Sequence, residues 1–270
     1  MGRIGRLRLA GLLLSVTLLA GACDHQDANG RTTGRVPATP VGSVAPPATS
    51  TLDKSCLREA SGARPFRFRT AGGAVLVGVV VGRGRTGLVL AHGRGGDLCE
   101  WLPYAQRFAE QGYQALAFDF EGFGGSRAGS GADAGIETDV VAAAGQLRRR
   151  GADRIVLVGS SMGATAALAA ATRIRPPVAG VVSLSGAAAF GAVNALAAMP
   201  HLRVPVLFVT ADDDEPFLGA ARAMYRRARS ADKRLLVASR GHGSVILAFP
   251  GQGPRVLAAM RRFITDQARR

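Results

Sequence analysis

A chain of 270 residues, of which 47% are hydrophobic, is long enough to bury one sizeable core, and this length is common for a single α/β domain. The formal net charge is +15, and nearly all of the positive charge is arginine because Lys54 and Lys233 are the only lysines. Aromatic residues make up 6% of the chain and are not interleaved with a basic run, which argues against nucleic-acid binding.

The first 22 residues have the three parts of an export signal. An apolar stretch over residues 9–20 is preceded by three arginines and followed by small residues before Cys23. The stretch is shorter than the roughly 20 residues of a membrane-spanning helix, so a permanent transmembrane helix is the less favoured alternative. Removal of this signal leaves 31 basic and 19 acidic residues, a net charge of +12, which favours adhesion to anionic lipid or polymer at low salt.

Residues 19–23, Leu-Ala-Gly-Ala-Cys, resemble the lipobox of bacterial lipoproteins, in which the cysteine is lipidated on its sulfur and becomes the new N-terminus. Ala20 stands where that family usually has leucine. The resemblance implies lipid on Cys23 and an extracytoplasmic protein that is anchored to the cell membrane. Without lipidation, the same residues form an ordinary cleavage site, and the protein would be secreted.

Residues 23–51 are predicted to form a flexible tether. This segment is rich in Gly, Ala, Pro, Thr and Ser and has almost no large apolar side chains, so burial cannot offset the entropy lost on ordering it. The predicted organisation is therefore a signal peptide at 1–22, a tether at 23–51 and one folded domain at 52–270.

Two cysteines, Cys56 and Cys99, remain once Cys23 is assigned to lipid. An exported chain meets an oxidising compartment, in which an even pair of cysteines can close. We therefore predict a disulfide between them. The alternative is two buried free thiols, because the sequence does not give the distance between the two Cα atoms.

From Pro65 onward, short β-rich runs alternate with amphipathic helical stretches, which predicts an α/β fold. We expect a three-layer α/β/α sandwich in which helices cover both faces of an eight-stranded, mostly parallel sheet. The predicted strands are 66–69, 74–81, 87–91, 114–118, 154–158, 178–184, 204–210 and 234–238, and the predicted helices are about 97–111, 135–150, 162–174, 216–229 and 254–268. Only one short helix, at 187–198, fits between the sixth and seventh strands, so we expect little or no lid and an open site.

One motif supplies a candidate nucleophile. Residues 155–166 comprise a buried strand, then G-x-S-x-G, then an alanine-rich helix, which is the context of a nucleophile elbow. Gly159 and Gly163 are needed because side chains in so tight a turn would strike the neighbouring strand or helix. Ser161 would then stand beside the helix N-terminus, whose dipole favours negative charge. The alternative for Ser161 is a helix cap with no chemistry.

This motif resembles that of the α/β-hydrolase fold family, which includes esterases, lipases, thioesterases, peptidases and dienelactone hydrolases, and the resemblance extends over residues 87–242. The family places its nucleophile, acid and histidine in that chain order. His242 follows the eighth strand, so the resemblance implies that it is the base. Three aspartates follow the seventh strand, and Asp214 occupies the family's position for the acid, with Asp212 and Asp213 as the alternatives.

Two further segments are similar to motifs of this family. Residues 88–96 resemble its HG motif, which implies an oxyanion hole formed by the backbone N–H groups of Arg94 and Met162, with His92 shaping the loop. Residues 119–126 resemble its D-x-R-G-x-G-x-S turn, with Glu121 in the place of arginine.

The resemblance and the motifs together predict a serine hydrolase that cleaves small or polymeric carboxylic esters through Ser161, His242 and Asp214 and an acyl-enzyme intermediate. This chemistry requires no cofactor, and no Cys/His cluster has the spacing of zinc ligands. A peptidase or thioesterase of the same fold is the alternative among enzymes. An inactive binding module at the cell envelope is the alternative of another class, because a fold does not prove a function. The natural substrate and the oligomeric state are left open.

Overall fold

The computed structural model describes residues 55–59, 63–129 and 135–269, all within one compact unit that spans Pro47–Arg270. The predicted signal peptide at 1–22, the lipidation candidate Cys23 and the predicted tether at 23–51 lie outside the described residues. Within the described part of the chain, each helix is too short or too polar to span a membrane.

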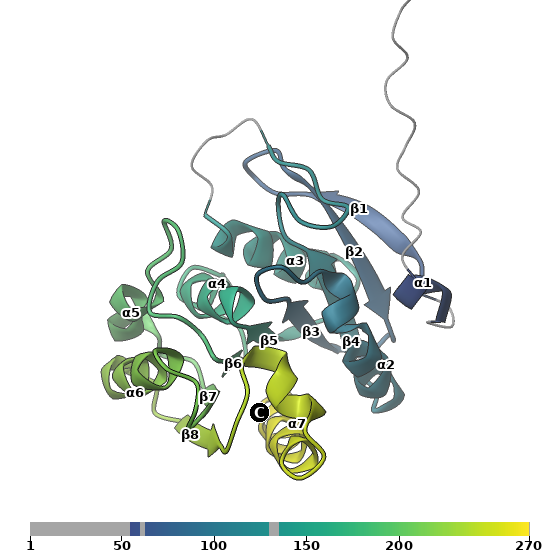
Figure 1. Ribbon diagram of the computed structural model, residues 1–270. Coiled ribbons are helices and arrows are strands. Elements are labelled where there is room, and N and C mark those ends of the chain that lie inside the picture. The colour runs from purple at the N-terminus through teal and green to yellow at the C-terminus, as the bar shows by residue number, and fades with distance from the viewer. Residues whose placement is uncertain (1–54, 60–62, 130–134, 270) are drawn as a thin grey trace, which may run out of the picture. The chain divides into compact units, whose positions relative to one another are not determined.

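Eight strands form one sheet in the described residues, in the order β1-β2-β4-β3-β5-β6-β7-β8 (Figure 1). The strand β2 runs antiparallel to both of its neighbours, β1 and β4, and every other neighbouring pair is parallel. The strands are β1 (Pro65–Arg69), β2 (Val75–Val81), β3 (Thr86–Ala91), β4 (Gln114–Asp119), β5 (Arg154–Ser160), β6 (Gly180–Leu184), β7 (Val206–Ala211) and β8 (Lys233–Ala238).

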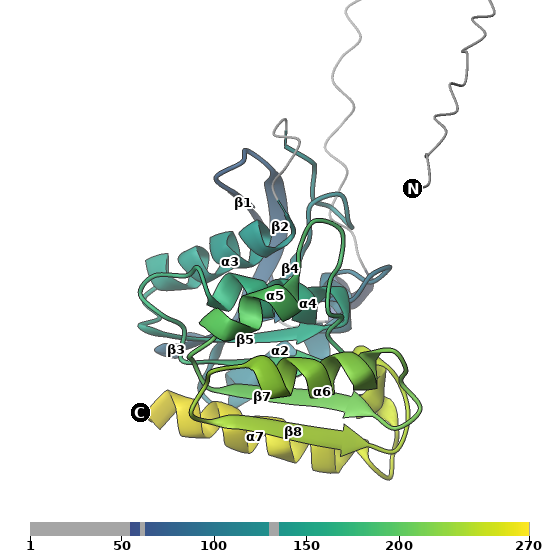
Figure 2. The same cartoon turned by 90° about the vertical axis from the view of Figure 1, so that its left-hand side faces the viewer.

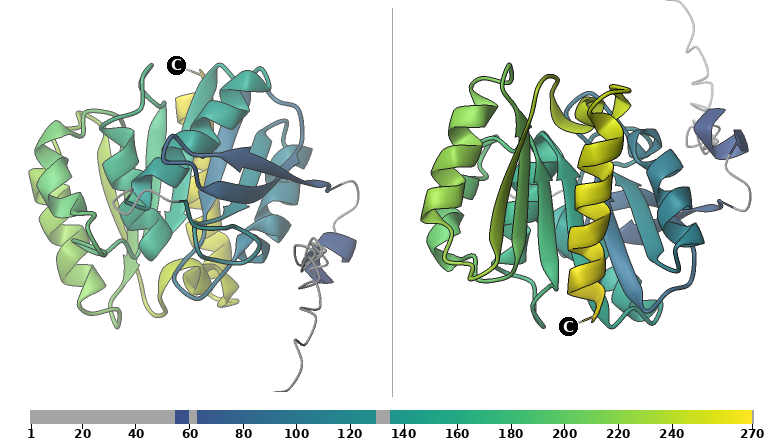
Figure 3. Two further views of the ribbon diagram at one scale, coloured as in Figure 1. Left: turned by 90° about the horizontal axis from the view of Figure 1, so that it is seen from above. Right: turned by 90° about the horizontal axis from the view of Figure 1, so that it is seen from below.

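Helices cover both faces of this sheet. Figure 2 shows α7 on one side of the sheet and α3, α4, α5 and α6 on the other, and the right-hand view of Figure 3 shows that α2 shares the face of α7. The helices are α1 (Ser55–Glu59), α2 (Leu102–Glu110), α3 (Glu137–Arg149), α4 (Met162–Ala171), α5 (Ala195–Ala198), α6 (Phe217–Arg227) and α7 (Gly253–Arg269), with short 3-10 turns η1 (Leu98–Glu100), η2 (Met199–His201) and η3 (Gly243–Ala248).

Each face of the sheet has its own hydrophobic core. Successive strand residues point to opposite faces, so Ile155 and Leu157 of β5 belong to the core under α3, α4 and α6, whereas Val156 and Val158 belong to the core under α2 and α7. All four side chains are at most 1% exposed. The central strands are near-continuous apolar runs because both of their faces are covered by helices. Polar residues therefore occur mainly where these strands end.

The predicted sheet is confirmed, since each of the eight strands lies within two residues of its predicted bounds. The predicted helix at 187–198 is wrong, because only Ala195–Ala198 is helical there. Asn194 starts that helix by accepting a hydrogen bond from the N–H of Ala197 at 2.8 Å, and Phe190 pairs with Val193 in the loop before it. A side-chain cap thus sets the start of the helix despite the helix propensity of the preceding alanines.

The predicted disulfide between Cys56 and Cys99 is confirmed, with the two Cα atoms 5.8 Å apart. It joins α1 to η1, directly ahead of α2. Leu57 of α1 packs against the core under α2 and α7, so α1 is held by both a covalent bond and apolar contact.

Replacement of both cysteines, Cys56→Ala with Cys99→Ala, is expected to lower the free energy of unfolding by about 2 to 4 kcal/mol. The reason is that the bond closes a loop between residues 43 apart in sequence and so restricts the unfolded chain. Urea unfolding of residues 23–270 measures the change, and wild-type protein in reductant should match the variant. An unchanged unfolding midpoint in both would contradict this account.

Candidate active site

The candidate nucleophile lies in a strained turn between β5 and α4. Ser161 has φ of 50° and ψ of −112°, a backbone conformation that residues other than glycine rarely adopt. Hydrogen bonds hold it there: its N–H donates to the carbonyl of Leu184 at 2.8 Å, and its carbonyl accepts from the N–H of Thr165 at 3.0 Å. Ser161 therefore sits at the junction of β5 and α4, where its N–H bonds to the end of β6 and its carbonyl accepts the first hydrogen bond of the helix.

Close backbone contacts explain the two glycines of the motif. A Cβ atom on Gly159 would lie 2.3 Å from the carbonyl oxygen of Gly163, and a Cβ atom on Gly163 would lie 2.3 Å from the carbonyl oxygen of Ala91. The expectation that side chains here would strike the neighbouring helix and strand is confirmed. Because the obstructing atoms are backbone, neither contact can be relieved by a side-chain rotation.

The structure brings the side chains of Ser161, His242 and Asp214 together in one hydrogen-bonded series. Nε2 of His242 lies 2.8 Å from Oγ of Ser161, and Nδ1 of His242 lies 2.8 Å from Oδ1 of Asp214. An ionised carboxylate only accepts hydrogen bonds, so Nδ1 carries the proton and Nε2 is left to accept from the serine hydroxyl. The side chain of Asp214 is 6% exposed and that of His242 is 42% exposed, so the acid is shielded while the imidazole stays open to a substrate.

The three aspartates after β7 have different surroundings. Asp214 meets His242, whereas Oδ1 of Asp213 accepts a hydrogen bond from the N–H of Gly241 at 2.8 Å. Asp212 is exposed. The N-cap position of α6 is Pro216, which makes no side-chain cap, so Asp213 holds the loop before His242 rather than the helix.

Two serines that sequence analysis gave no role also contact this site. Ser185 follows β6, is fully buried, and lies within hydrogen-bonding distance of both Asp214 and the residue after His242. Oγ of Ser160 accepts a hydrogen bond from the N–H of Ser244 at 3.0 Å. In the sequence, the signal that could have found Ser160 was Gly243, because a glycine beside a candidate base indicates close packing. In the structure, a Cβ atom added to Gly243 would lie 2.5 Å from Oγ of Ser160.

The predicted oxyanion-hole residues lie in segments that contact the nucleophile. Residues 93–96 form a turn in which the N–H of Gly96 donates to the carbonyl of Gly93 at 3.1 Å, and Arg94 is the second residue of that turn. A Cβ atom on Gly93 would lie 3.6 Å from Cβ of Ser161. Met162 is the first residue of α4, so its N–H precedes the first hydrogen bond of the helix.

Glu100 supports the turn from behind. Its Oε2 accepts a hydrogen bond from the N–H of Gly93 at 2.8 Å, while its Oε1 is buried without a hydrogen-bond partner in the described structure. Sequence analysis missed this residue, since a single glutamate in a 3-10 turn has no distinguishing pattern. The carboxylate orients the peptide between His92 and Gly93, directly ahead of the peptide that carries the N–H of Arg94.

His92 fixes the other side of the same loop. Its ring is fully buried, Nδ1 lies 2.8 Å from the carbonyl oxygen of Gly93, and Nε2 lies 3.1 Å from the backbone nitrogen of Phe120. Since the carbonyl can only accept and the N–H can only donate, Nδ1 carries the ring proton. Burial lowers the pKa of His92, so the ring stays neutral and joins the ends of β3 and β4.

The turn after β4 is built around carboxylates. Asp119 accepts hydrogen bonds from the N–H groups of Leu98 and Gly125, both at 2.7 Å. Glu121 accepts from the N–H of Gly129 at 2.8 Å, so the residue that stands in the place of the family's arginine closes the loop instead. Asp139 at the start of α3 accepts from the N–H of Glu121 at 2.8 Å.

Asp139→Asn is expected to stabilise the protein more at pH 8 than at pH 5. Burial, together with the carboxylates of Glu121 and Glu137, raises the pKa of Asp139 from 3.8 to about 7. The folded wild type therefore binds this proton more strongly than the unfolded chain, and its stability falls as the pH rises from about 4 to 7. At about 1.4 kcal/mol per pKa unit, the advantage of asparagine should grow by about 3 kcal/mol between pH 5 and pH 8.

Urea unfolding at the two pH values measures this difference. Asp153→Asn is the matched control, because Asp153 is an exposed carboxylate whose pKa is lowered by its hydrogen bond to Arg85. That variant should differ from wild type by the same amount at pH 5 and pH 8, because its carboxylate is already ionised at pH 5 in both the folded and the unfolded chain. A constant difference between Asp139→Asn and wild type would contradict the raised pKa.

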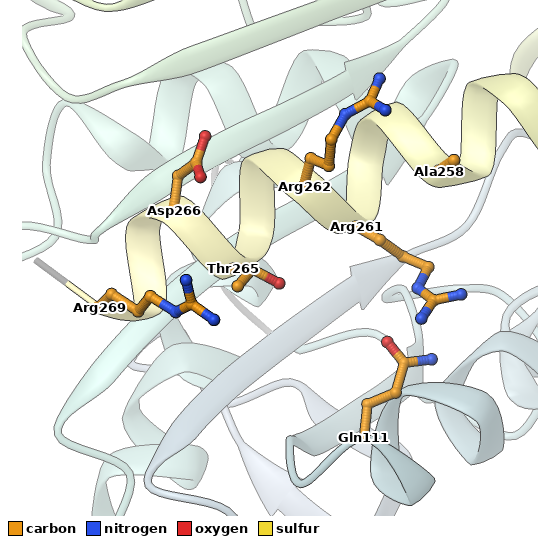
Figure 4. Close-up of a pocket in the computed structure, with 7 residues that line it drawn as sticks. All are labelled: Gln111, Ala258, Arg261, Arg262, Thr265, Asp266 and Arg269. Carbon is orange, nitrogen blue, oxygen red and sulfur yellow. The ribbon is translucent and has the colours of Figure 1, made fainter.

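A pocket of about 400 Å³ lies elsewhere, between α7 and the end of α2. Figure 4 shows Arg261 of α7 extending toward Gln111 of the α2 end, with the other lining residues on α7. Asp266 in its lining pairs with Arg234 at 3.2 Å. The pocket contains none of Ser161, His242 and Asp214, so it is not part of the candidate active site.

Comparisons with known proteins agree with this architecture. Residues 83–195 match a family model described as serine aminopeptidase, S33. No curated protein matches the sequence. An esterase of Pyrococcus furiosus superimposes with a TM-score of 0.65 at 18% identity, over 77% of this chain and 93% of that one. A dienelactone hydrolase of Anabaena variabilis superimposes with a TM-score of 0.58 at 20% identity, over 76% of this chain and 98% of that one.

A monoacylglycerol lipase of Paleococcus ferrophilus gives a TM-score of 0.60 at 16% identity, over 71% of this chain and 99% of that one. Identities this low speak for the fold alone. The order of the strands, the elbow at Ser161 and these likenesses agree, and the chain has the α/β-hydrolase fold.

Proposed function

We propose that the protein is a serine hydrolase that cleaves carboxylic esters. The observation that carries the proposal is the series Asp214–His242–Ser161, joined by two hydrogen bonds of 2.8 Å at the end of a strained nucleophile turn. A nucleophile that is hydrogen-bonded to a base, which is in turn oriented by a buried acid, is the arrangement that acyl transfer needs. The names of the similar structures, which include an esterase and a monoacylglycerol lipase, support an ester substrate.

In the proposed reaction, Oγ of Ser161 attacks the ester carbonyl while Nε2 of His242 takes the serine proton. The backbone N–H groups of Arg94 and Met162 would hold the negative oxygen of the tetrahedral intermediate, aided by the dipole of α4. His242 then gives its proton to the leaving alcohol, which leaves an acyl group on Ser161. A water molecule then attacks the acyl carbon while His242 takes one of its protons, and His242 gives this proton to Oγ of Ser161 as the bond to the acyl group breaks and the acid is released.

The connection between β6 and β7 bears on the size of the substrate. In the described residues it contains only α5, η2 and short loops, and the side chain of His242 remains 42% exposed. The ring of Phe217, the first residue of α6, lies 4.3 Å from the ring of His242 and forms an apolar wall beside it. These features favour a small ester or an exposed ester of a polymer over a long lipid enclosed in a tunnel.

A peptidase is the second candidate, because the matching family model is described as a serine aminopeptidase. The match over residues 83–195 includes Ser161 and Arg94 but ends before Asp214 and His242. The proposed acyl-enzyme chemistry is common to esters, thioesters and amides, so the leaving group must be determined by a substrate panel.

Ser161→Ala is expected to abolish labelling by a fluorophosphonate and to lower turnover of p-nitrophenyl esters by about 1,000-fold or more, because the attacking oxygen is removed. Purified residues 23–270 are assayed on short-chain p-nitrophenyl esters, a thioester and aminoacyl p-nitroanilides. Ser230→Ala, the same substitution at a loop remote from the site, should keep full labelling. A folded wild-type protein that neither labels nor turns over any substrate would favour the inactive binding module.

We also propose that lipid on Cys23 anchors the mature domain outside the cytoplasm, with secretion as the alternative. The lipobox-like residues 19–23 support this location. The disulfide between Cys56 and Cys99 supports export too, because such bonds persist in oxidising compartments.

Cys23→Ala is expected to move the protein from the membrane fraction of a bacterial host to the soluble or secreted fraction, because the variant has no sulfur to lipidate. Cell fractionation with immunodetection measures the shift, and intact-protein mass spectrometry measures the added lipid. Cys56→Ala serves as the control and should stay in the membrane fraction. Wild-type protein recovered in the medium without lipid would support plain secretion.

A further inference from the structure

Ser185 lies in an unusual position at the carboxyl end of β6. It is fully buried and has a positive φ of 51°, which is uncommon for a residue other than glycine. Its N–H donates to the carbonyl oxygen of Val209 at 2.8 Å, which fixes the backbone at the same edge of the sheet as the nucleophile. The backbone strain is therefore accompanied by a fixed direction for the side chain.

The hydroxyl of Ser185 joins the acid to the histidine loop. Its Oγ donates to Oδ2 of Asp214 at 2.5 Å and accepts from the N–H of Gly243 at 2.8 Å. A serine hydroxyl has one proton, and the N–H of Gly243 can only donate, so that proton is committed to the carboxylate. Thr210 lies farther away, with 3.4 Å between its Oγ1 and Oδ2 of Asp214. Ser185 is thus the closer hydroxyl to the oxygen that His242 does not use.

Ser160 provides a natural comparison. It is also a buried serine, and its Oγ accepts from the N–H of Ser244, the next residue along the same loop, at 3.0 Å. In the described structure it makes no hydrogen bond to Asp214. Both serines therefore hold the loop that carries His242, but only Ser185 also touches the acid.

We propose that Ser185 is a positioning residue that directs Asp214 at His242 and draws charge from its carboxylate, and so sets the pH below which the site loses its base. This inference rests on the proposed hydrolase function. A hydrogen bond from a hydroxyl to a carboxylate stabilises the anion and draws charge from it. When the hydroxyl is removed, Asp214 offers more charge to the imidazole, which then holds a proton up to a higher pH.

Other charged side chains on the surrounding loops do not change in this comparison. They are Asp212, Asp213 and Glu215 after β7, Arg240 ahead of His242, and Arg94 and Glu100 after β3. Because Ser185→Ala and Ser160→Ala leave all of them in place, a difference between the two pH profiles reports on the contact with Asp214.

The experiment compares Ser185→Ala with Ser160→Ala in purified residues 23–270, with the pH dependence of kcat and KM measured on a p-nitrophenyl ester. In Ser185→Ala we expect kcat to fall by about 10-fold with little change in KM, since only the orientation of the base is lost. The midpoint of the acidic limb of kcat/KM should move up by about half a pH unit to one unit. In Ser160→Ala kcat should also fall, while the midpoint stays at its wild-type value.

Ser185→Gly separates the hydroxyl from the backbone. Glycine accepts the positive φ without strain, so this variant folds even if alanine is not tolerated at this position. It should reproduce the upward shift of the acidic limb. An NMR titration of the His242 ring protons in each variant gives a second readout that does not depend on turnover.

The outcomes separate the two proposals. Acidic limbs and ring titrations that are the same in wild type, Ser185→Gly and Ser160→Ala would overturn the role of Ser185 while leaving the hydrolase intact. A wild-type protein without turnover, combined with a shifted ring titration in Ser185→Gly, would overturn the hydrolase but not the coupling of Ser185 to Asp214 and His242. An equal shift in Ser160→Ala would also count against the proposal, because it would assign the effect to the loop alone.

Discussion

The contact between the first turn of α4 and the end of β3 is the constraint on which the site depends. At Gly163 the two backbones approach so closely that even a methyl group would meet a carbonyl oxygen at 2.3 Å. This approach leaves Ser161 in its strained turn and places the N–H of Met162 beside the loop that begins at His92. A wider spacing would separate the nucleophile and the N–H of Met162 from the N–H of Arg94, the other peptide group proposed to stabilise the negative oxygen.

The parallel sheet turns this local constraint into a site. Strands β3, β5, β6, β7 and β8 are neighbours that run in one direction, so the loops that follow them meet at one edge. Asp213 after β7, Ser185 after β6 and Ser160 at the end of β5 hold the histidine loop through three of its backbone N–H groups, on Gly241, Gly243 and Ser244. His242 therefore owes its orientation to backbone contacts on both of its sides as well as to the carboxylate it faces.

The elements that could be predicted from the sequence are those with a periodic or packing signal. The eight strands are apolar runs bounded by polar or turn residues, and Gly159 and Gly163 report a close approach that no other residue type permits. The start of α5 was missed because the cap at Asn194 outweighs the propensity of the alanines before it. Ser185 and Ser160 were missed because a lone serine at a strand end has no pattern, and their loop partners lie 58 and 84 residues away in the sequence.

The disulfide between Cys56 and Cys99 has a mechanical consequence. Tension applied to the chain ahead of Cys56 passes through the sulfur–sulfur bond to η1 and α2, which pack on one of the cores. The 42 residues between the two cysteines, which include β1 at the edge of the sheet, form a closed loop that carries no load. Pulling from the N-terminal side thus cannot peel β1 away from β2. A domain that is held at that end would bear the force through η1 and α2 instead of unfolding from its edge strand.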